Sequence, residues 1–314
     1  MRSNFSSSTT ASLASRLRRA LLTGAALVLL GLSACGGSDE LDRGPTTLPV
    51  SAALNGLYWD VGTSRLYLTD DATNTIRVWD GDKSFASSMA LPSPPASGVT
   101  LGQIAGGKDG TLYVTRFGFG TDGTVIAVPK MGAAVNLKGL DATRRRIGLA
   151  IAPDGALIDG WFIKGGAGAL SLLTVNGVQA SETELVTGLG KPVGVAVAGD
   201  QLFVSDQNTG NVLSYSLSRV RAKPATLADG KVLATFTTLD GIDLMTAASD
   251  GTLFFGGSGG RLFQLSPKGE VKVLATGWPK VRGVAYDEAN RRLFVAVVAA
   301  DASSQSSIRI VPIN

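Results

Sequence analysis

Short runs of apolar residues, or of alternating apolar and polar residues, fill the chain from about residue 47 to its end. Gly, Asp and Asn turn residues separate these runs. Alternation is typical of half-buried β-strands, whereas an amphipathic helix repeats about every 3.6 residues. No stretch in this part of the chain keeps the helical repeat beyond two turns. We therefore predict an all-β domain over residues 47–314.

A glycine that opens an apolar run recurs six times, at spacings of 46, 46, 46, 47 and 42 residues. A second run beginning with Leu follows each glycine after about ten residues, and a third run follows in most segments. Turn residues such as Lys108-Asp109-Gly110 lie between the first two runs and suit a β-hairpin. The six blade-start glycines are Gly56, Gly102, Gly148, Gly194, Gly241 and Gly283.

This repeat predicts a six-bladed β-propeller, because four antiparallel strands in about 40–50 residues make one blade. Each blade buries its faces only against its neighbours, so the ring must close. Residues 47–50 precede Gly56 as residues 271–274 precede Gly283, so we expect the N-terminal segment to supply the outermost strand of the last blade. Pro49 suits such an edge strand, which tolerates a missing N–H. A pair of β-sandwiches would not explain the equal periods.

The first 34 residues have the pattern of a secretory signal peptide. Four arginines and no acidic residue precede an apolar run of 13 residues, Ala20 to Leu32, and the small residues Ser33 and Ala34 follow it. A membrane-spanning helix needs about 20 apolar residues, so an uncleaved anchor is disfavoured. The arginines are Arg2, Arg16, Arg18 and Arg19.

Cys35 is the only cysteine and directly follows this segment. Leu32-Ser33-Ala34-Cys35 resembles the lipobox of bacterial lipoproteins, and this resemblance implies cleavage before Cys35 and acylation of its thiol. The polar residues 35–46 would then form a flexible tether. We expect a protein anchored by lipid in the bacterial cell envelope, in the outer membrane and facing the periplasm or the surface. The alternative is an ordinary signal peptide with a chance cysteine after it.

Charge and composition exclude several classes of function. The chain has 29 Lys and Arg against 25 Asp and Glu, and removing the four leader arginines leaves the two signs balanced. A nucleic-acid partner is therefore not indicated. Without histidine there is no Ser-His-Asp triad and no histidine zinc ligand. Asp70, Asp71 and Asp206 lie at the ends of second strands, where they could act as carboxylate pairs, but we favour the capping of turns.

Several segments resemble known propeller families. Leu68-Thr69-Asp70-Asp71 followed by Asn74 is similar to NHL repeats. Asn55-Gly56-Leu57-Tyr58-Trp59-Asp60 and Leu239-Asp240-Gly241-Ile242 resemble segments of the gluconolactonase/senescence-marker (strictosidine-synthase-like) superfamily. That resemblance implies a six-bladed propeller and, in members that hydrolyse lactones, a divalent metal held on the axis by a Glu, two Asn and an Asp.

The residue before each blade-start glycine is expected to face the axis. Asn55 stands where the family has Glu, Ile147 and Val193 stand where it has Asn, and only Asp240 matches. Hard cations need several oxygen ligands, so we predict no metal and no other cofactor. Instead we expect an ion pair between Asp240 and Arg282 at the mouth of the channel. The six axial residues are Asn55, Leu101, Ile147, Val193, Asp240 and Arg282.

Basic residues gather three positions before the blade-start glycine in blades 3, 4 and 6. They are Arg145, Lys191 and Lys280, with Arg144 and Arg146 beside the first. One interpretation is a solvated rim, and the other is an entrance that steers anions towards the axis.

Three functions remain open. The favoured one is a non-catalytic module that binds a small anionic ligand or an envelope protein. The second is a lactonase-type hydrolase with a rearranged axial site, metal-dependent or not. The third is a structural subunit of an envelope assembly. Ordered metal on the axis would favour the hydrolase.

Overall fold

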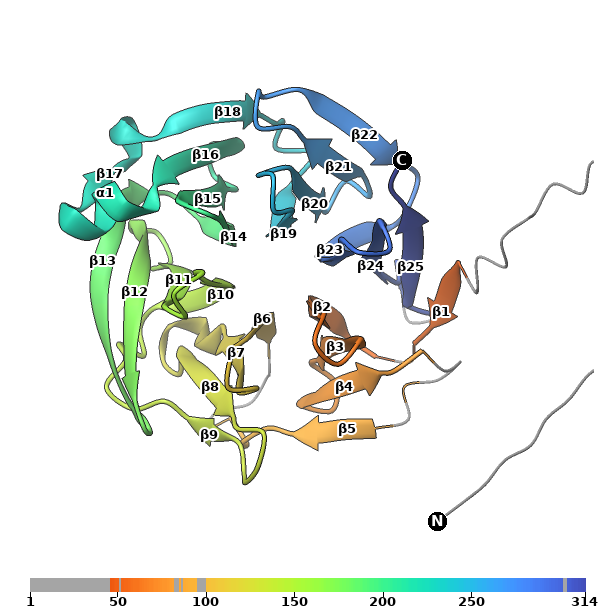
Figure 1. Ribbon diagram of the computed structural model, residues 1–314, viewed down its shortest axis with the longest axis horizontal. Coiled ribbons are helices and arrows are strands. Elements are labelled where there is room, and N and C mark those ends of the chain that lie inside the picture. The colour runs from red at the N-terminus through yellow and green to blue at the C-terminus, as the bar shows by residue number, and fades with distance from the viewer. Residues whose placement is uncertain (1–45, 51, 82–84, 86, 95–99, 302–303) are drawn as a thin grey trace, which may run out of the picture. The chain divides into compact units, whose positions relative to one another are not determined.

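The structure is a computed structural model that describes residues 46–314, apart from residues 51, 82–84, 86, 95–99 and 302–303. The described residues belong to one compact unit. Six sheets stand like blades around a central axis, as Figure 1 shows. The prediction of an all-β, six-bladed propeller is therefore confirmed. The predicted signal peptide, Cys35 and nearly all of the tether lie outside the described residues.

In each blade the first strand lies nearest the axis and the next strands follow outwards (Figure 1). Blade 1 consists of β2 (Leu54–Asp60), β3 (Arg65–Asp70), β4 (Thr75–Trp79) and β5 (Ser87–Ala90). Blade 2 consists of β6 (Leu101–Gly106), β7 (Leu112–Arg116), the short 3-10 segment η1 (Gly118–Gly120), β8 (Thr124–Val128) and β9 (Val135–Asn136). Blade 3 consists of β10 (Arg145–Ile151), β11 (Leu157–Phe162), β12 (Gly168–Asn176), β13 (Gln179–Leu189) and β17 (Ala225–Thr226), which pairs in parallel with β13.

The second half of the ring follows the same plan. Blade 4 consists of β14 (Pro192–Ala198), β15 (Gln201–Asp206), β16 (Asn211–Ser216) and β18 (Lys231–Thr235), with α1 (Leu217–Ala222) and η2 (Leu227–Asp229) between its last two strands. Blade 5 consists of β19 (Ile242–Ala247), β20 (Leu253–Gly257), β21 (Leu262–Leu265) and β22 (Val271–Ala275). Blade 6 consists of β23 (Lys280–Asp287), β24 (Arg292–Val298), β25 (Ser307–Pro312) and β1 (Thr47–Pro49).

The ring closes through β1, the first strand of the described chain. It runs antiparallel to β25, the last strand, with Thr47 opposite Arg309 and Pro49 opposite Ser307. Pro49 is exposed on this edge, where its missing N–H leaves no gap in a ladder. The predicted closure of the last blade by the N-terminal segment is confirmed.

The core of the described region is divided among the contacts between blades. Six clusters of buried apolar residues each join one blade to the next. Between blades 6 and 1, for example, the rings of Trp59 and Phe294 stack with their centroids 5.0 Å apart, and Leu48 of β1 packs into the same cluster. Each blade is thus stabilised by its two neighbours, because apolar burial in a propeller lies between sheets.

Around the axis the first strands approach so closely that no Cβ fits at five of the predicted glycines. An added Cβ would meet the backbone of the next first strand at Gly56, Gly102, Gly148 and Gly194, and of β2 at Gly283. Second-strand hydroxyls link the same neighbours: Thr115 donates to Ile147 O at 2.7 Å and Ser205 donates to Asp243 O at 3.1 Å.

Blade 5 departs from this pattern. Gly241 lies before β19, in a left-handed turn with φ of 50°, and the strand begins only at Ile242. A Cβ added at Gly102 or Gly148 would meet the residue directly before the next blade-start glycine, Ile147 or Val193. A Cβ added at Gly194 would meet Asp243, so the blade-start position of blade 5 directly follows Asp243. Gly241 is therefore not the blade-start position, and the prediction for blade 5 is wrong by three residues.

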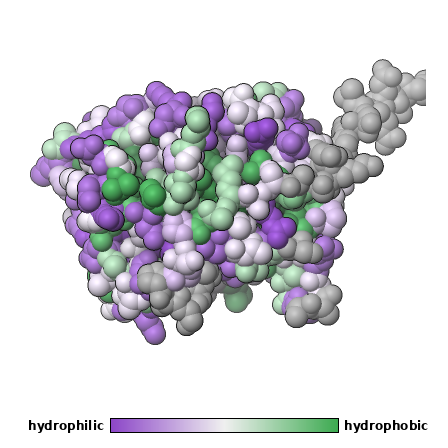
Figure 2. All heavy atoms as spheres, turned by 90° about the horizontal axis from the view of Figure 1, so that it is seen from below, coloured by the Kyte–Doolittle hydropathy of each residue, from purple (hydrophilic) through white to green (hydrophobic). Residues whose placement is uncertain are grey.

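No helix among the described residues is long and apolar enough to cross a membrane. Figure 2 shows the molecule from below, turned by 90° from the view of Figure 1. On this side of the ring, apolar residues are scattered among polar ones.

Candidate functional site

A small cavity of about 190 Å³ lies where the first strands meet. Four of the six predicted axial residues line it: Asn55, Leu101, Ile147 and Arg282. Val193 is buried and does not line the cavity, and blade 4 contributes Lys191 in its place. The remaining lining residues are Thr100, Gly102, Phe117, Phe119 and Arg146.

Asp240 does not reach this cavity. Its carboxylate accepts hydrogen bonds from Thr237 N at 2.9 Å and Thr237 Oγ1 at 2.7 Å, and it forms an ion pair with Arg261. Arg282 instead pairs with Asp243, with 3.0 Å between Nη1 and Oδ2. The predicted Asp240–Arg282 pair is therefore wrong, because the left-handed turn at Gly241 places Asp243, not Asp240, next to the axis.

Arg282 and Lys191 line the cavity, and Lys280, which does not line it, lies close enough to interact with the charges of both. Burial lowers the pKa of Lys280, and the charges of Arg282 and Lys191 lower it further, while Asp243 opposes them. Lys191 Nζ donates to the neutral amide of Gln207, 2.6 Å away. The only described carboxylate in an ion pair with any of the three is Asp243. The positively charged side chains at and near the cavity therefore outnumber the carboxylates paired with them.

The end of β15 holds Lys191 in place. Both oxygens of the buried Asp206 carboxylate accept backbone hydrogen bonds, from Gly190 N at 2.9 Å and Lys191 N at 2.7 Å. Asp70 caps its own turn in the same way, accepting from Ala53 N and Ala72 N. The capping role predicted for Asp70 and Asp206 is confirmed.

The other basic residues of the predicted rim have different surroundings. Arg146 is fully buried and pairs with Asp159 and with Glu182, whose Oε1 lies 2.5 Å from its Nη2. Arg144 pairs with the same Glu182 at 2.7 Å and lies 3.7 Å from the centroid of Trp161. These two arginines are neutralised within blade 3 and serve its packing. Arg145 donates from Nη2 to Phe119 O at 3.0 Å.

Sequence reasoning assigned Asp71 to turn capping with Asp70 and missed its position next to the cavity residue Leu101. Asp71 Oδ1 accepts from Leu101 N at 2.6 Å, and Asn55 Nδ2 donates to the carbonyl oxygen of the same Leu101 at 2.5 Å. Burial raises the pKa of Asp71 to about 7, against the lowering effects of the Leu101 N–H and the Arg282 charge. A carboxyl group that titrates near neutral pH thus lies beside the cavity. Its signal in the sequence is its position, one residue after the end of a second strand.

Phe117 occupies the same position after the second strand of blade 2. With Phe119 it lines the cavity, and the two ring centroids lie 5.0 Å apart in an edge-on arrangement. Phe162, at the end of β11, continues this cluster 5.8 Å from Phe117, and Lys191 Nζ lies 5.6 Å from the Phe162 ring. Aromatic side chains therefore face the same space as the cations.

The axial residues do not fit a divalent metal. Within the described part of the chain no three acidic, His or Cys residues are grouped so that they could hold one. Asn55 and Asp243 bring oxygens, but Leu101 and Ile147 bring none, and the Asp243 carboxylate is already bound by Arg282. A calcium ion takes about six to eight oxygen ligands, so a cation here would be short of them.

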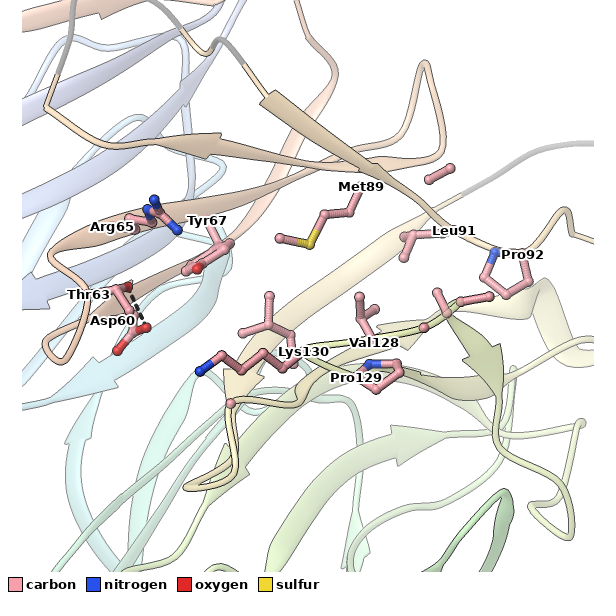
Figure 3. A pocket seen from close by; sticks show the side chains of 16 residues that line it. Asp60, Thr63, Arg65, Tyr67, Met89, Leu91, Pro92, Val128, Pro129 and Lys130 are labelled. Carbon is pink, nitrogen blue, oxygen red and sulfur yellow. Dashed lines mark hydrogen bonds between the residues drawn. The ribbon is translucent and has the colours of Figure 1, made fainter.

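A larger cavity, of about 810 Å³, opens away from the axis between blades 1 and 2 (Figure 3). Apolar side chains such as Met89, Leu91 and Val128 line much of it, and Lys130 lies beside Val128 and Pro129. Asp60, on the side of blade 1, is occupied in a turn, where Thr63 Oγ1 donates to it at 2.6 Å. Because its charged groups do not converge, we place the candidate site on the axis.

Comparisons with known proteins agree on the fold. No protein-family model matches the chain, and no curated protein matches it. Among solved structures, a gluconolactonase from Xanthomonas campestris aligns with a TM-score of 0.63 and 17% identity, over 84% of this chain and 88% of that one. A calcium-binding protein, regucalcin, from Agrobacterium tumefaciens strain C58 gives 0.63 and 14%, over 86% and 97%.

A third similar structure carries a different chemistry. The PQQ-bound aldose sugar dehydrogenase from Streptomyces coelicolor aligns with a TM-score of 0.64 and 15% identity, over 85% of this chain and 96% of that one. The resemblance to six-bladed propellers of the gluconolactonase and regucalcin type is thus confirmed for the fold. At these identities the likeness carries no information about activity.

Proposed function

We propose that this protein is an exported, lipid-anchored propeller that binds a small organic anion, a carboxylate, in its axial cavity without converting it. The observation that supports this is that Lys191 and Arg282 line one cavity with Lys280 close to both, while Asp243 is the only described carboxylate in an ion pair with any of these three. Partly buried cations are costly to leave unpaired, so an anion that enters the cavity recovers electrostatic free energy.

The dimensions and walls of the cavity support a small ligand. Its volume of about 190 Å³ lies below the roughly 300–1,000 Å³ of sites for drug-sized molecules. Leu101 and Ile147 give it an apolar side, whereas Arg282 and Lys191 give it a charged one. This division suits a molecule with one anionic group and a compact apolar body.

Titration calorimetry with benzoate and cyclohexanecarboxylate, both fully ionised at pH 7, tests the proposal. Arg282→Gln should weaken binding about 10- to 100-fold, the loss expected for a hydrogen bond to a charged group. The matched control is Arg219→Gln, which removes the same charge from an exposed position on α1 and should leave the affinity unchanged. Absence of binding, or equal losses in both variants, would overturn the proposal.

The lipid anchor rests on the single cysteine after the apolar leader. Cys35→Ala should leave the leader unprocessed or release the protein from membranes, because the acylated thiol is the attachment point. Mass spectrometry of the mature N-terminus from membrane fractions measures this. An unmodified Cys35 at a membrane-bound, mature N-terminus would contradict the anchor.

Asp71 favours a second function, a metal-independent lactone hydrolase. Its pKa near 7 suits a general base, which would take a proton from water as the water oxygen attacks the lactone carbonyl. The ring C–O bond would then break, and the leaving alkoxide would take the proton that Asp71 had removed from water. Aldonolactone turnover at pH 8 that is lost in Asp71→Asn would establish this function, and its absence in the parent would exclude it.

A further inference from the structure

The segment that follows β7 holds an aromatic side chain in a strained backbone conformation at the mouth of the axial cavity. Phe119 has φ of 52°, a left-handed value that non-glycine residues rarely adopt, and Gly118 and Gly120 on either side also have positive φ. Its side chain is 53% exposed although it lines the cavity. Such strain costs about 1–3 kcal/mol and persists only where the surroundings impose it.

Blade 3 contacts this segment through Arg145. Arg145 donates to Phe119 O at 3.0 Å, and its guanidinium carbon lies 5.2 Å from the centroid of Phe117. One arginine thus contacts both phenylalanines at the cavity. This places Arg145, which sequence reasoning grouped with the anion-steering rim, in a positioning role.

The two chemical halves of the cavity come from different blades. Phe117 and Phe119 follow the second strand of blade 2, whereas Lys191 and Arg282 belong to blades 4 and 6, further round the ring (Figure 1). A ligand that touches both halves would present its charge to the cations and a flat apolar surface to the phenylalanines. Stacked or edge-on contacts between aromatic rings contribute about 0.5–1.5 kcal/mol beyond their buried area.

We propose that the site selects an aromatic carboxylate, whose ring packs on Phe117 and Phe119 while its carboxylate meets Arg282 and Lys191. The inference deepens the proposed function and rests on it. Phe119 is a specificity-determining residue in this arrangement, because an aliphatic ligand of the same size and charge gains the ion pairs but not the ring contacts.

The experiment compares benzoate with cyclohexanecarboxylate, which has the same charge and carbon number but no aromatic ring. The purified protein should bind benzoate about 2- to 10-fold more tightly, the ratio that corresponds to roughly 0.5–1.5 kcal/mol. Phe119→Leu should bring the ratio of the two affinities close to one, and Phe119→Tyr should restore the preference for benzoate. Phe117→Leu provides a second test if Phe119→Leu does not fold.

The outcomes separate the two proposals. Equal binding of the two carboxylates, with the loss on Arg282→Gln retained, would overturn the aromatic selectivity and keep the anion site. A preference for benzoate that survives both leucine substitutions would also overturn the role of the phenylalanines. Absence of binding by both carboxylates would overturn the anion site itself.

Discussion

At the scale of single residues, the axial cavity is defined by how its charges are paired. Arg282 pairs with the buried Asp243, whereas Lys191 donates to the neutral amide of Gln207. Burial and the cationic neighbours lower the pKa of Lys280. Asp71 stays largely protonated up to neutral pH for the same reason, burial. The site thus keeps its positive character below about pH 7 and loses part of it above.

The raised pKa of Asp71 makes a prediction for stability. A carboxyl group that is harder to ionise when folded stabilises the fold at low pH and ceases to do so as pH rises through its folded pKa. Relative to Asp71→Asn, the free energy of unfolding of the parent should therefore fall between about pH 4 and pH 8, by on the order of 3 kcal/mol. Urea titrations across this range measure it, with Asp80→Asn as the exposed control. A constant difference would contradict the assignment.

The corrected ion pairs can be tested by double-mutant cycles with alanine. Asp243 and Arg282 should couple by about 1–2 kcal/mol, and Asp240 and Arg261 by about 0.5–1 kcal/mol, because Arg261 is more exposed. Asp240 and Arg282 should be additive within about 0.5 kcal/mol, as sites without a shared partner are. Thermal or urea unfolding of the single and double variants provides these values. Strong coupling between Asp240 and Arg282 would restore the pairing first expected from the sequence.

At the scale of elements, the sequence predicts what depends on local repetition. Five blade-start glycines could be placed correctly, because a side chain at these positions would clash with the neighbouring strand and only glycine fits. They are Gly56, Gly102, Gly148, Gly194 and Gly283. Blade 5 has no glycine at the equivalent position, so Gly241 of the preceding turn was mistaken for it. Asp243 was missed for that reason.

The contribution of Phe119 could not be predicted for a different reason. It lies in a segment between strands, and its direction depends on a hydrogen bond from Arg145 of the next blade, 26 residues away. Periodicity identifies strands and their buried faces, but it does not record contacts of this kind. The cations of blades 4 and 6 were found from the sequence because they keep a fixed distance from the blade-start glycines.

Closure of the ring depends on one short element, β1, and therefore on Leu48. This side chain is 2% exposed and packs between blades 6 and 1. Leu48→Ala should reduce the free energy of unfolding by about 2–5 kcal/mol, the usual cost of truncating a buried leucine. Pro49→Ala in the same strand is the matched control and should change it by less than about 0.5 kcal/mol. If the two variants melt alike, β1 does not close the ring.

At the scale of the whole molecule, the propeller is a support whose chemistry is set by a few residues at its centre. The gluconolactonase, the calcium-binding regucalcin and the PQQ-bound dehydrogenase share its architecture, yet their names describe different chemistries. The same ring of first strands presents Asn55, Leu101, Ile147 and Arg282 here. The charge on this axis is therefore supplied by side chains.

These axial residues predict that an anion raises the melting temperature and that a metal ion leaves it unchanged. A ligand that binds only the native state stabilises it by RT ln(1 + [L]/Kd), or about 2.7 kcal/mol at a hundredfold excess over Kd. Saturating benzoate should therefore raise the melting temperature by several degrees, and Arg282→Gln should remove the effect. Calcium, manganese and a chelator should each leave the melting temperature unchanged, since Arg282 already binds Asp243 where a cation would need its oxygens. A calcium-dependent rise that persists in excess benzoate would show that the axis holds a metal after all.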